Sequence, residues 1–130
     1  PRPVPGSALL RVRAVGLNFR DVLNVMGLYP GDPGPPGADA AGTVLEVGDR
    51  VEHLRPAEGV FGEAPGCLST YSLAPAALLT QMPKSWSFEE AATMPVIFVT
   101  VEESLGDLAH LRRGEHVLIH AAAGGVGLVA

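Results

Sequence analysis

A short apolar run followed by a glycine-rich loop, near the C-terminal end, constrains the fold of this chain more than any other feature. Residues 116–127 read HVLIHAAAGGVG, with Ala122, Gly124 and Gly127 in A-x-G-x-x-G spacing. The run at 117–119 is typical of a buried parallel strand, and the spacing matches the dinucleotide-binding fingerprint with alanine at its first glycine. In that fingerprint, Gly124 lets the backbone approach a pyrophosphate, and Gly127 lets the next helix pack on the strand. A glycine-rich turn after any buried strand is an equally open interpretation at this point.

The two ends of the sequence suggest a piece of a longer polypeptide. The chain of 130 residues begins at Pro1, without a methionine, and stops at Ala130, three residues after the fingerprint. The helix, the second strand and the ribose-binding acid expected about 20 residues further on are therefore missing. We expect most of a nucleotide-binding domain to be absent, preceded by one domain of ordinary size with a real core.

Composition and charge exclude several classes of function. The formal net charge of -5 argues against a nucleic-acid or anionic-membrane surface. No apolar run reaches the roughly 20 residues of a membrane span, and no signal-peptide pattern opens the chain. The single Cys67 cannot form an internal disulfide, and a reducing cytoplasmic setting is the default. We therefore predict a cytoplasmic protein with no nucleic-acid or membrane partner.

The sequence also predicts that no metal is bound. One cysteine cannot supply a multi-cysteine zinc site. The histidines have no acidic or cysteine partners at metal-ligand spacing; they are His53, His110, His116 and His120.

Most of the chain reads as short strands joined by turns. Alternating apolar and polar residues predict a half-buried strand over 7–15, and apolar runs between turn signals predict three more; these are 43–47, 60–62 and 68–73. The stretch 29–42, with its prolines and glycines, predicts an ordered loop or lid. Several short strands with turn signals indicate a small barrel or sandwich.

Three segments have helical spacing. Residues 18–27 place apolar side chains on one helical face after Asn18, a favourable N-cap. Ser87 and Glu90 predict a capping box in a unit over 83–95, with Trp86 packed on Ala91. A third helix is expected over 96–111. The domain boundary falls near Pro95, which gives domains 1–95 and 96–130.

Together these segments resemble the medium-chain dehydrogenase/reductase superfamily, and within it the enoylreductase domain of modular polyketide synthases. The matching segments read GLNFRDVL, MGLYPG, AAG, VFG and HAAAGGVG; they occupy 16–23, 26–31, 40–42, 60–62 and 120–127. They follow the order and spacing of the family over nearly the whole chain. Quinone oxidoreductases share much of this pattern and are the nearest alternative.

The resemblance implies a mixed β and α/β fold with two domains. Residues 1–95 would form a GroES-like, partly open β-barrel that binds substrate. Residues 96–130 would form a linking helix and then the first strand and glycine loop of a truncated Rossmann domain for NADPH. It implies NADPH-dependent reduction of an α,β-enoyl thioester held on an acyl carrier protein, beside neighbouring synthase domains. The alternatives are a zinc-free NADPH:quinone oxidoreductase and a non-catalytic structural or interaction module. As a fragment, the chain is expected to be inactive alone.

The resemblance also assigns roles to individual residues. Asn18 would lie near the nicotinamide and the substrate, although its role as a helix N-cap is as well supported. Tyr29 matches a tyrosine that influences α-carbon stereochemistry in some polyketide enoylreductases; packing under the proline-rich loop is the alternative. Thr100 matches a threonine of the nicotinamide pocket in quinone oxidoreductases, or it is a mid-helix threonine facing solvent.

The remaining assignments concern the cofactor and zinc. The cofactor phosphates and the helix turn are assigned to the glycine loop, namely Ala122, Gly124, Gly125, Val126 and Gly127. Zinc-dependent relatives need an early cysteine and a Gly-His-Glu step, where this chain has Asn18 and the sequence GAD at 37–39. Both departures indicate a zinc-free enzyme. The lysine and aspartate proposed as proton donors in polyketide enoylreductases lie outside this sequence.

Overall fold

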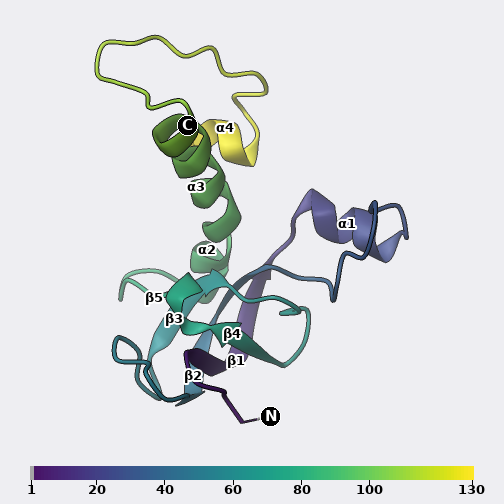
Figure 1. Cartoon of the computed structure of the whole chain (residues 1–130), viewed down its shortest axis with the longest axis vertical. Helices are drawn as coiled ribbons and strands as arrows, with labels where there is room; N and C mark the ends of the chain where they lie inside the picture. The colour runs from purple at the N-terminus through teal and green to yellow at the C-terminus, as the bar shows by residue number, and fades with distance from the viewer. Residues whose placement is uncertain (1) are drawn as a thin grey trace. The chain divides into compact units, whose positions relative to one another are not determined.

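A computed structural model describes residues 2–130 of the chain (Figure 1). The chain divides into two compact units, Pro1–Pro95 and Val96–Ala130. Each unit has its own internal organisation and is described separately.

The first unit is built on an antiparallel sheet of five strands in the order β4-β1-β2-β3-β5. The strands are β1 (Ser7–Gly16), β2 (Asp39–Val47), β3 (Gly59–Glu63), β4 (Tyr71–Pro75) and β5 (Leu79–Gln81). The sheet is not closed, because β4 and β5 are its two ends. This architecture confirms the predicted partly open barrel.

Strand β2 begins at Asp39, four residues before the predicted start at Thr43. The small residues after Asp39 are not part of the proline-rich loop, because they pair with strands on both sides: Ala40 is opposite Val15 of β1 and Gly62 of β3. Gly42 explains the small residues, since a Cβ there would lie 2.5 Å from the carbonyl oxygen of Arg11. The strands approach too closely for a larger side chain.

The predictions for the last two strands also need correction. Strand β4 begins at Tyr71 rather than at Leu68. Strand β5 and the short 3-10 helix η1 (Ala76–Leu78) before it were not predicted. A strand of three residues is too short to show the alternation on which sequence-based assignment depends.

Two apolar clusters form the core of this unit. The main cluster lies inside the sheet and includes Leu10, Val44, Leu54 and Val60. The second cluster consists of buried alanines of β2 and α2 (Phe88–Ala92), with Trp86 and Phe88 packed against them. Both hydrogen bonds of the predicted capping box form: Glu90 N–H donates to Ser87 Oγ at 3.1 Å, and Ser87 N–H donates to the Glu90 carboxylate at 2.8 Å.

Helix α1 (Phe19–Val25) forms after Asn18, as predicted, and ends two residues before Gly27. Gly27 has φ +68, a left-handed conformation that suits glycine at a helix stop. The apolar side chains of α1 are largely exposed, with Phe19 at 75% and Val25 at 73%. Its buried residue is Asp21.

The second unit begins within α3 (Pro95–Val101), which continues into a π-helical segment, η2 (Glu102–Leu108). The helix therefore ends three residues before the predicted Leu111. Helix α4 (Gly125–Val129) follows the glycine loop. In residues 2–130, no helix is both long and apolar enough to cross a membrane.

The strand predicted over 117–119 does not form, and this prediction was wrong for the structure as it stands. These residues have no secondary structure, and Leu118 is 83% exposed. A parallel strand is stabilised by hydrogen bonds to neighbouring strands and by cover on both faces. Within the described residues, no strand pairs with 117–119.

Candidate active site

Asn18 joins helix α1 to the start of β2. Its backbone is extended, with φ -107 and ψ 156, and its N–H donates to Asp21 Oδ2 at 3.0 Å. Its side-chain Nδ2 donates to Asp39 Oδ2 at 3.1 Å, across 21 residues of sequence. The predicted N-cap position is confirmed, and the contact with buried Asp39 holds the amide in place.

Asp21 connects the same helix to the proline-rich loop. The residue is 5% exposed, and its Oδ1 accepts a hydrogen bond from Gly37 N–H at 2.8 Å. A buried carboxylate is tolerated when backbone N–H groups satisfy its oxygens. Asp21 and Asp39 thus support Asn18 and the loop. The sequence marked Asp21 only as a capping residue and gave no signal that Asp39 would lie beside Asn18.

Tyr29 lies at the other end of α1, where the proline-rich loop begins. Its N–H donates to the carbonyl oxygen of Leu23 at 3.2 Å, and its side chain is half-buried. The Arg20 guanidinium lies over its ring, 5.3 Å from the centroid. The ring is therefore held by a specific neighbour, and sequence analysis had not singled out that neighbour.

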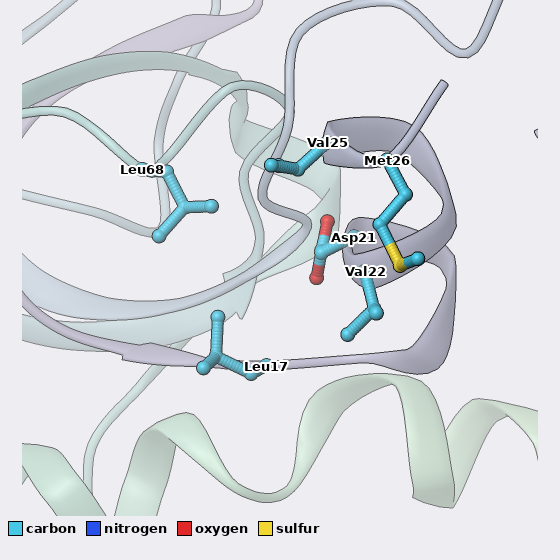
Figure 2. A pocket seen from close by; sticks show the side chains of 6 residues that line it. All are labelled: Leu17, Asp21, Val22, Val25, Met26 and Leu68. Carbon is cyan, nitrogen blue, oxygen red and sulfur yellow. The ribbon is translucent and has the colours of Figure 1, made fainter. Parts of the chain in front are cut away.

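A pocket of about 280 Å³ opens beside these residues, between α1 and the segment before β4 (Figure 2). Five apolar side chains and one carboxylate line it; they are Leu17, Asp21, Val22, Val25, Met26 and Leu68. Both ends of the Asp21 carboxylate accept backbone hydrogen bonds. Because both carboxylate oxygens already accept hydrogen bonds, an apolar ligand in this pocket would leave no polar side chain of the lining without a partner.

Cys67 is buried near the two aspartates. Its Sγ donates to the carbonyl oxygen of Asp39 at 3.4 Å. Burial raises the pKa of the Cys67 thiol from 9.0 to about 11, and the charges of Asp21 and Asp39 add to the increase. The thiolate is the nucleophilic form of cysteine. Cys67 is thus a packed thiol at neutral pH and no candidate nucleophile.

Thr100 and the glycine loop belong to the second unit. Thr100 Oγ1 donates to the carbonyl oxygen of Val96 at 2.6 Å, within α3, and Thr100 is exposed. The sequence-predicted residues therefore fall into two groups. Asn18 and Tyr29 are at opposite ends of α1 in the first unit, while Thr100 and the loop are in the second.

The glycine loop packs tightly at the third position of its fingerprint. A Cβ on Gly127 would lie 2.6 Å from the carbonyl oxygen of Ala121 and 2.7 Å from the Cα of Ala122, so only glycine fits. Gly124 is the N-cap of α4, and its N–H donates to Ala121 at 2.8 Å. The motif predicts that this position packs the helix against a strand, whereas here Gly127 packs against the turn at Ala121 and Ala122. The loop is compatible with a pyrophosphate at its helix N-terminus.

Among residues 2–130, no group of three or more histidine, cysteine or acidic side chains is arranged to hold a metal ion.

Comparison with known proteins identifies the family. Residues 4–84 match the family described as "Alcohol dehydrogenase GroES-like domain". The chain belongs to this family. The match covers all five strands and leaves α2 and the glycine loop outside it.

Proteins similar to this GroES-like domain include polyketide synthases, enoyl reductases and quinone oxidoreductases. The chain is 51% identical over 126 residues to the "Spectinabilin polyketide synthase system protein NorB" of Streptomyces orinoci. This alignment covers 97% of the chain and 6% of that protein. It matches the "CurK enoyl reductase" crystal structure with a TM-score of 0.90 and 37% identity, over 98% of the chain and 42% of the other. It also matches a quinone oxidoreductase of Pseudomonas syringae pv. Tomato DC3000, with a TM-score of 0.82, 38% identity and coverage of 98% and 40%.

These matches confirm the resemblance to enoyl reductases and quinone oxidoreductases of the medium-chain dehydrogenase/reductase superfamily. The chain spans 6% of the synthase protein and 42% of the solved enoyl reductase chain.

Proposed function

We propose that this chain is part of an enoylreductase of a polyketide synthase, which uses NADPH to reduce an α,β-unsaturated acyl thioester on an acyl carrier protein. The observation that carries the proposal is the 51% identity to a polyketide synthase protein over 97% of the chain. The structural similarity to the CurK enoyl reductase supports the same conclusion. The partners are the carrier-bound thioester and the neighbouring synthase domains, and the location is the cytoplasm.

The two units correspond, in this proposal, to a substrate-binding domain over 1–95 and to the linking helix and start of a nucleotide-binding domain over 96–130. Ala122, Gly124, Gly125, Val126 and Gly127 would hold the cofactor phosphates, and Thr100 would face the nicotinamide. When bound, NADPH supplies the hydride that the β-carbon of the substrate receives.

The first unit supplies the groups that face the substrate. Asn18, held by Asp39, would lie beside the nicotinamide and the reacting carbons. Tyr29 would give the α-carbon the proton of its hydroxyl, because a phenolic O–H group can donate a proton when it is held beside the reacting atom. The apolar pocket beside α1 agrees with a substrate that carries a hydrocarbon chain.

A stand-alone NADPH:quinone oxidoreductase is the second candidate. Its support is the match to the Pseudomonas syringae enzyme, whose identity of 38% is close to the 37% of the CurK match. It ranks second because the polyketide synthase match is higher in identity. Steady-state NADPH oxidation with an enoyl thioester and with a quinone separates the two. If the complete protein oxidises NADPH with the quinone but not with the enoyl thioester, the second candidate is favoured.

A separate experiment tests the role proposed for the Tyr29 hydroxyl in the complete enoylreductase. We predict that Tyr29→Phe and Tyr29→Val retain substantial NADPH oxidation with an α-methyl enoyl thioester, because hydride transfer needs only the cofactor and the substrate slot. The α-centre of the product becomes inverted or mixed, because another acid or water then supplies the proton. Chiral analysis of the reduced product measures the change.

Tyr71→Phe is the matched control, because Tyr71 is the other tyrosine of the chain and lies 51% exposed on β4. Its product should keep the wild-type configuration. If Tyr29→Phe also keeps the wild-type configuration at the wild-type rate, Tyr29 is a packed loop residue and its proposed role is wrong.

A further inference from the structure

Arg20 makes two contacts that meet at the start of the proline-rich loop. Its Nη2 donates to the carbonyl oxygen of Pro33 at 2.9 Å. Its guanidinium carbon lies 5.3 Å from the centroid of the Tyr29 ring, within the range of a cation–π interaction. Arg20 therefore touches both the ring of Tyr29 and the loop that follows it, from the first turn of α1.

We propose that Arg20 is a positioning residue that sets the orientation of the Tyr29 ring, and hence the face of the α-carbon that receives the proton. This inference rests on the proposed enoylreductase function. Arginine suits the role because its planar guanidinium can stack on an aromatic face while one of its N–H groups donates to a carbonyl oxygen. Lysine cannot make both contacts with the same geometry.

The rest of the loop is anchored without Arg20, so the effect of Arg20 can be isolated. Asn24 Nδ2 donates to the carbonyl oxygen of Gly34 at 3.0 Å, and the N–H of Gly34 donates to Asp32 Oδ1 at 2.9 Å. Gly37 N–H donates to buried Asp21 at 2.8 Å. After removal of the guanidinium, the bonds made by Asn24 and Asp21 still hold the loop to α1. The Pro33 carbonyl oxygen loses one donor and the Tyr29 ring loses the guanidinium over its face. We expect the ring to sample more orientations.

The first experiment compares Arg20→Met, Arg20→Lys and wild type in the complete enoylreductase with an α-methyl enoyl thioester. Exposed cation–π contacts have modest free energies, so the ratio of α-configurations in the product of Arg20→Met should fall by roughly two- to fivefold. Arg20→Lys retains the positive charge and should restore part of the ratio. In the Tyr29→Phe background, Arg20→Met should change the ratio no further, because the hydroxyl through which Arg20 acts is gone.

Arg13→Met is the matched control. The Arg13 guanidinium also lies over an aromatic ring of the first unit, 5.6 Å from the centroid of Phe88. Its loss removes one arginine and one cation–π contact at a different aromatic ring. The product ratio should stay at the wild-type value.

A second measurement does not depend on activity. The complete protein is labelled with 3-fluorotyrosine, and the Tyr29 resonance is assigned from its absence in Tyr29→Phe. Arg20→Met should shift this ¹⁹F resonance and leave that of Tyr71 unchanged, whereas Arg13→Met should move neither. If wild type shows no enoyl reduction but the Tyr29 resonance responds to Arg20→Met, the proposed function fails and the contact stands.

Two outcomes would overturn the proposal. One is a Tyr29 resonance and a product ratio that Arg20→Met leaves unchanged. The other is an equal change of the ratio in the wild-type and Tyr29→Phe backgrounds, which would show that Arg20 acts by a route that does not include Tyr29.

Discussion

At the scale of single residues, the polar contacts around α1 decide what the candidate site looks like. Sequence analysis identified Asn18 and Tyr29 from a motif, because both lie in segments with recognisable spacing. It could not identify their supports, since Asp39 lies 21 residues from Asn18 and Arg20 meets Tyr29 only after the chain has turned. The contact between Asn18 and Asp39 depends on the strand pairing that brings β2 beside the start of α1.

Cys67 gives a prediction about pH and stability. Its pKa is raised from 9.0 to about 11 in the folded protein, chiefly by burial. The unfolded chain loses the thiol proton first, so the contribution of this group to stability is fully present below pH 9 and declines as the pH rises toward 11. Relative to Cys67→Ala, the free energy of unfolding of wild type should fall by about 2 to 3 kcal/mol at most over this range. Urea unfolding at several pH values measures the difference.

The comparison with Cys67→Ala removes the effect of other groups that titrate in this range, since both proteins share them. Two parallel pH profiles would contradict the prediction. They would show that the thiol reaches solvent in the folded state and has an ordinary pKa. The rate of alkylation by iodoacetamide at pH 8 supplies an independent check, and it should be far slower in the folded protein than in urea.

At the scale of elements, the predicted bounds agree best with the structure where a local signal sets the end of a helix or strand. The N-caps of α1 and α2 were predicted correctly because cap residues act within one turn. The unit predicted over 83–95 is longer than α2, which spans Phe88–Ala92. The start of β2 was missed because close packing between strands selects small residues that resemble a loop. Helix α1 carries the expected apolar side chains, yet they are largely exposed. Amphipathic spacing predicts the helix but not the surface that covers its apolar side.

The capping box of α2 provides the element-scale prediction. Ser87→Ala removes the oxygen that accepts from Glu90 N–H at 3.1 Å. Loss of an N-cap typically costs about 1 kcal/mol. We expect this decrease in the free energy of unfolding of the first unit, because α2 carries the buried residues Ala91 and Ala92 of the second cluster. Thermal or urea unfolding followed by Trp86 fluorescence reports it.

Ser87→Asn is the matched variant, because asparagine caps helices about as well as serine. It should retain most of the stability that Ser87→Ala loses. Equal losses in the two variants would mean that the hydroxyl contributes through a contact other than the cap.

At the scale of the whole molecule, the two units differ in how far the sequence determines them. The first unit has its own sheet and core. Its strand and turn signals indicated a small barrel or sandwich, and the family resemblance implied the partly open barrel. The second unit contains the fingerprint, but residues 117–119 are not in a strand and α4 has five residues. A sequence motif encodes a turn and a close approach, as Gly127 shows. It does not supply the neighbouring strands that turn an extended segment into a sheet.

This difference leads to a prediction about the 130-residue chain by itself. We expect that it neither binds NADPH with micromolar affinity nor reduces an enoyl thioester. The chain spans 42% of the solved CurK enoyl reductase chain. In the dinucleotide-binding fold, the ribose contact lies about 20 residues beyond the glycine loop and on a second strand. The loop alone provides a few backbone N–H groups at the start of α4, and these cannot offset the loss of ligand freedom on binding.

Isothermal titration of NADPH into the 130-residue chain measures this, with a protein extended to the length of the solved relatives as the control. The extended protein should bind, and Gly127→Ala in it should weaken binding, because a Cβ at that position would lie 2.7 Å from the Cα of Ala122. In the 130-residue chain, Gly127→Ala should cause no measurable change in the NADPH titration. Micromolar binding by the short chain would contradict the prediction, and it would mean that residues 117–127 adopt the cofactor-binding geometry without neighbouring strands.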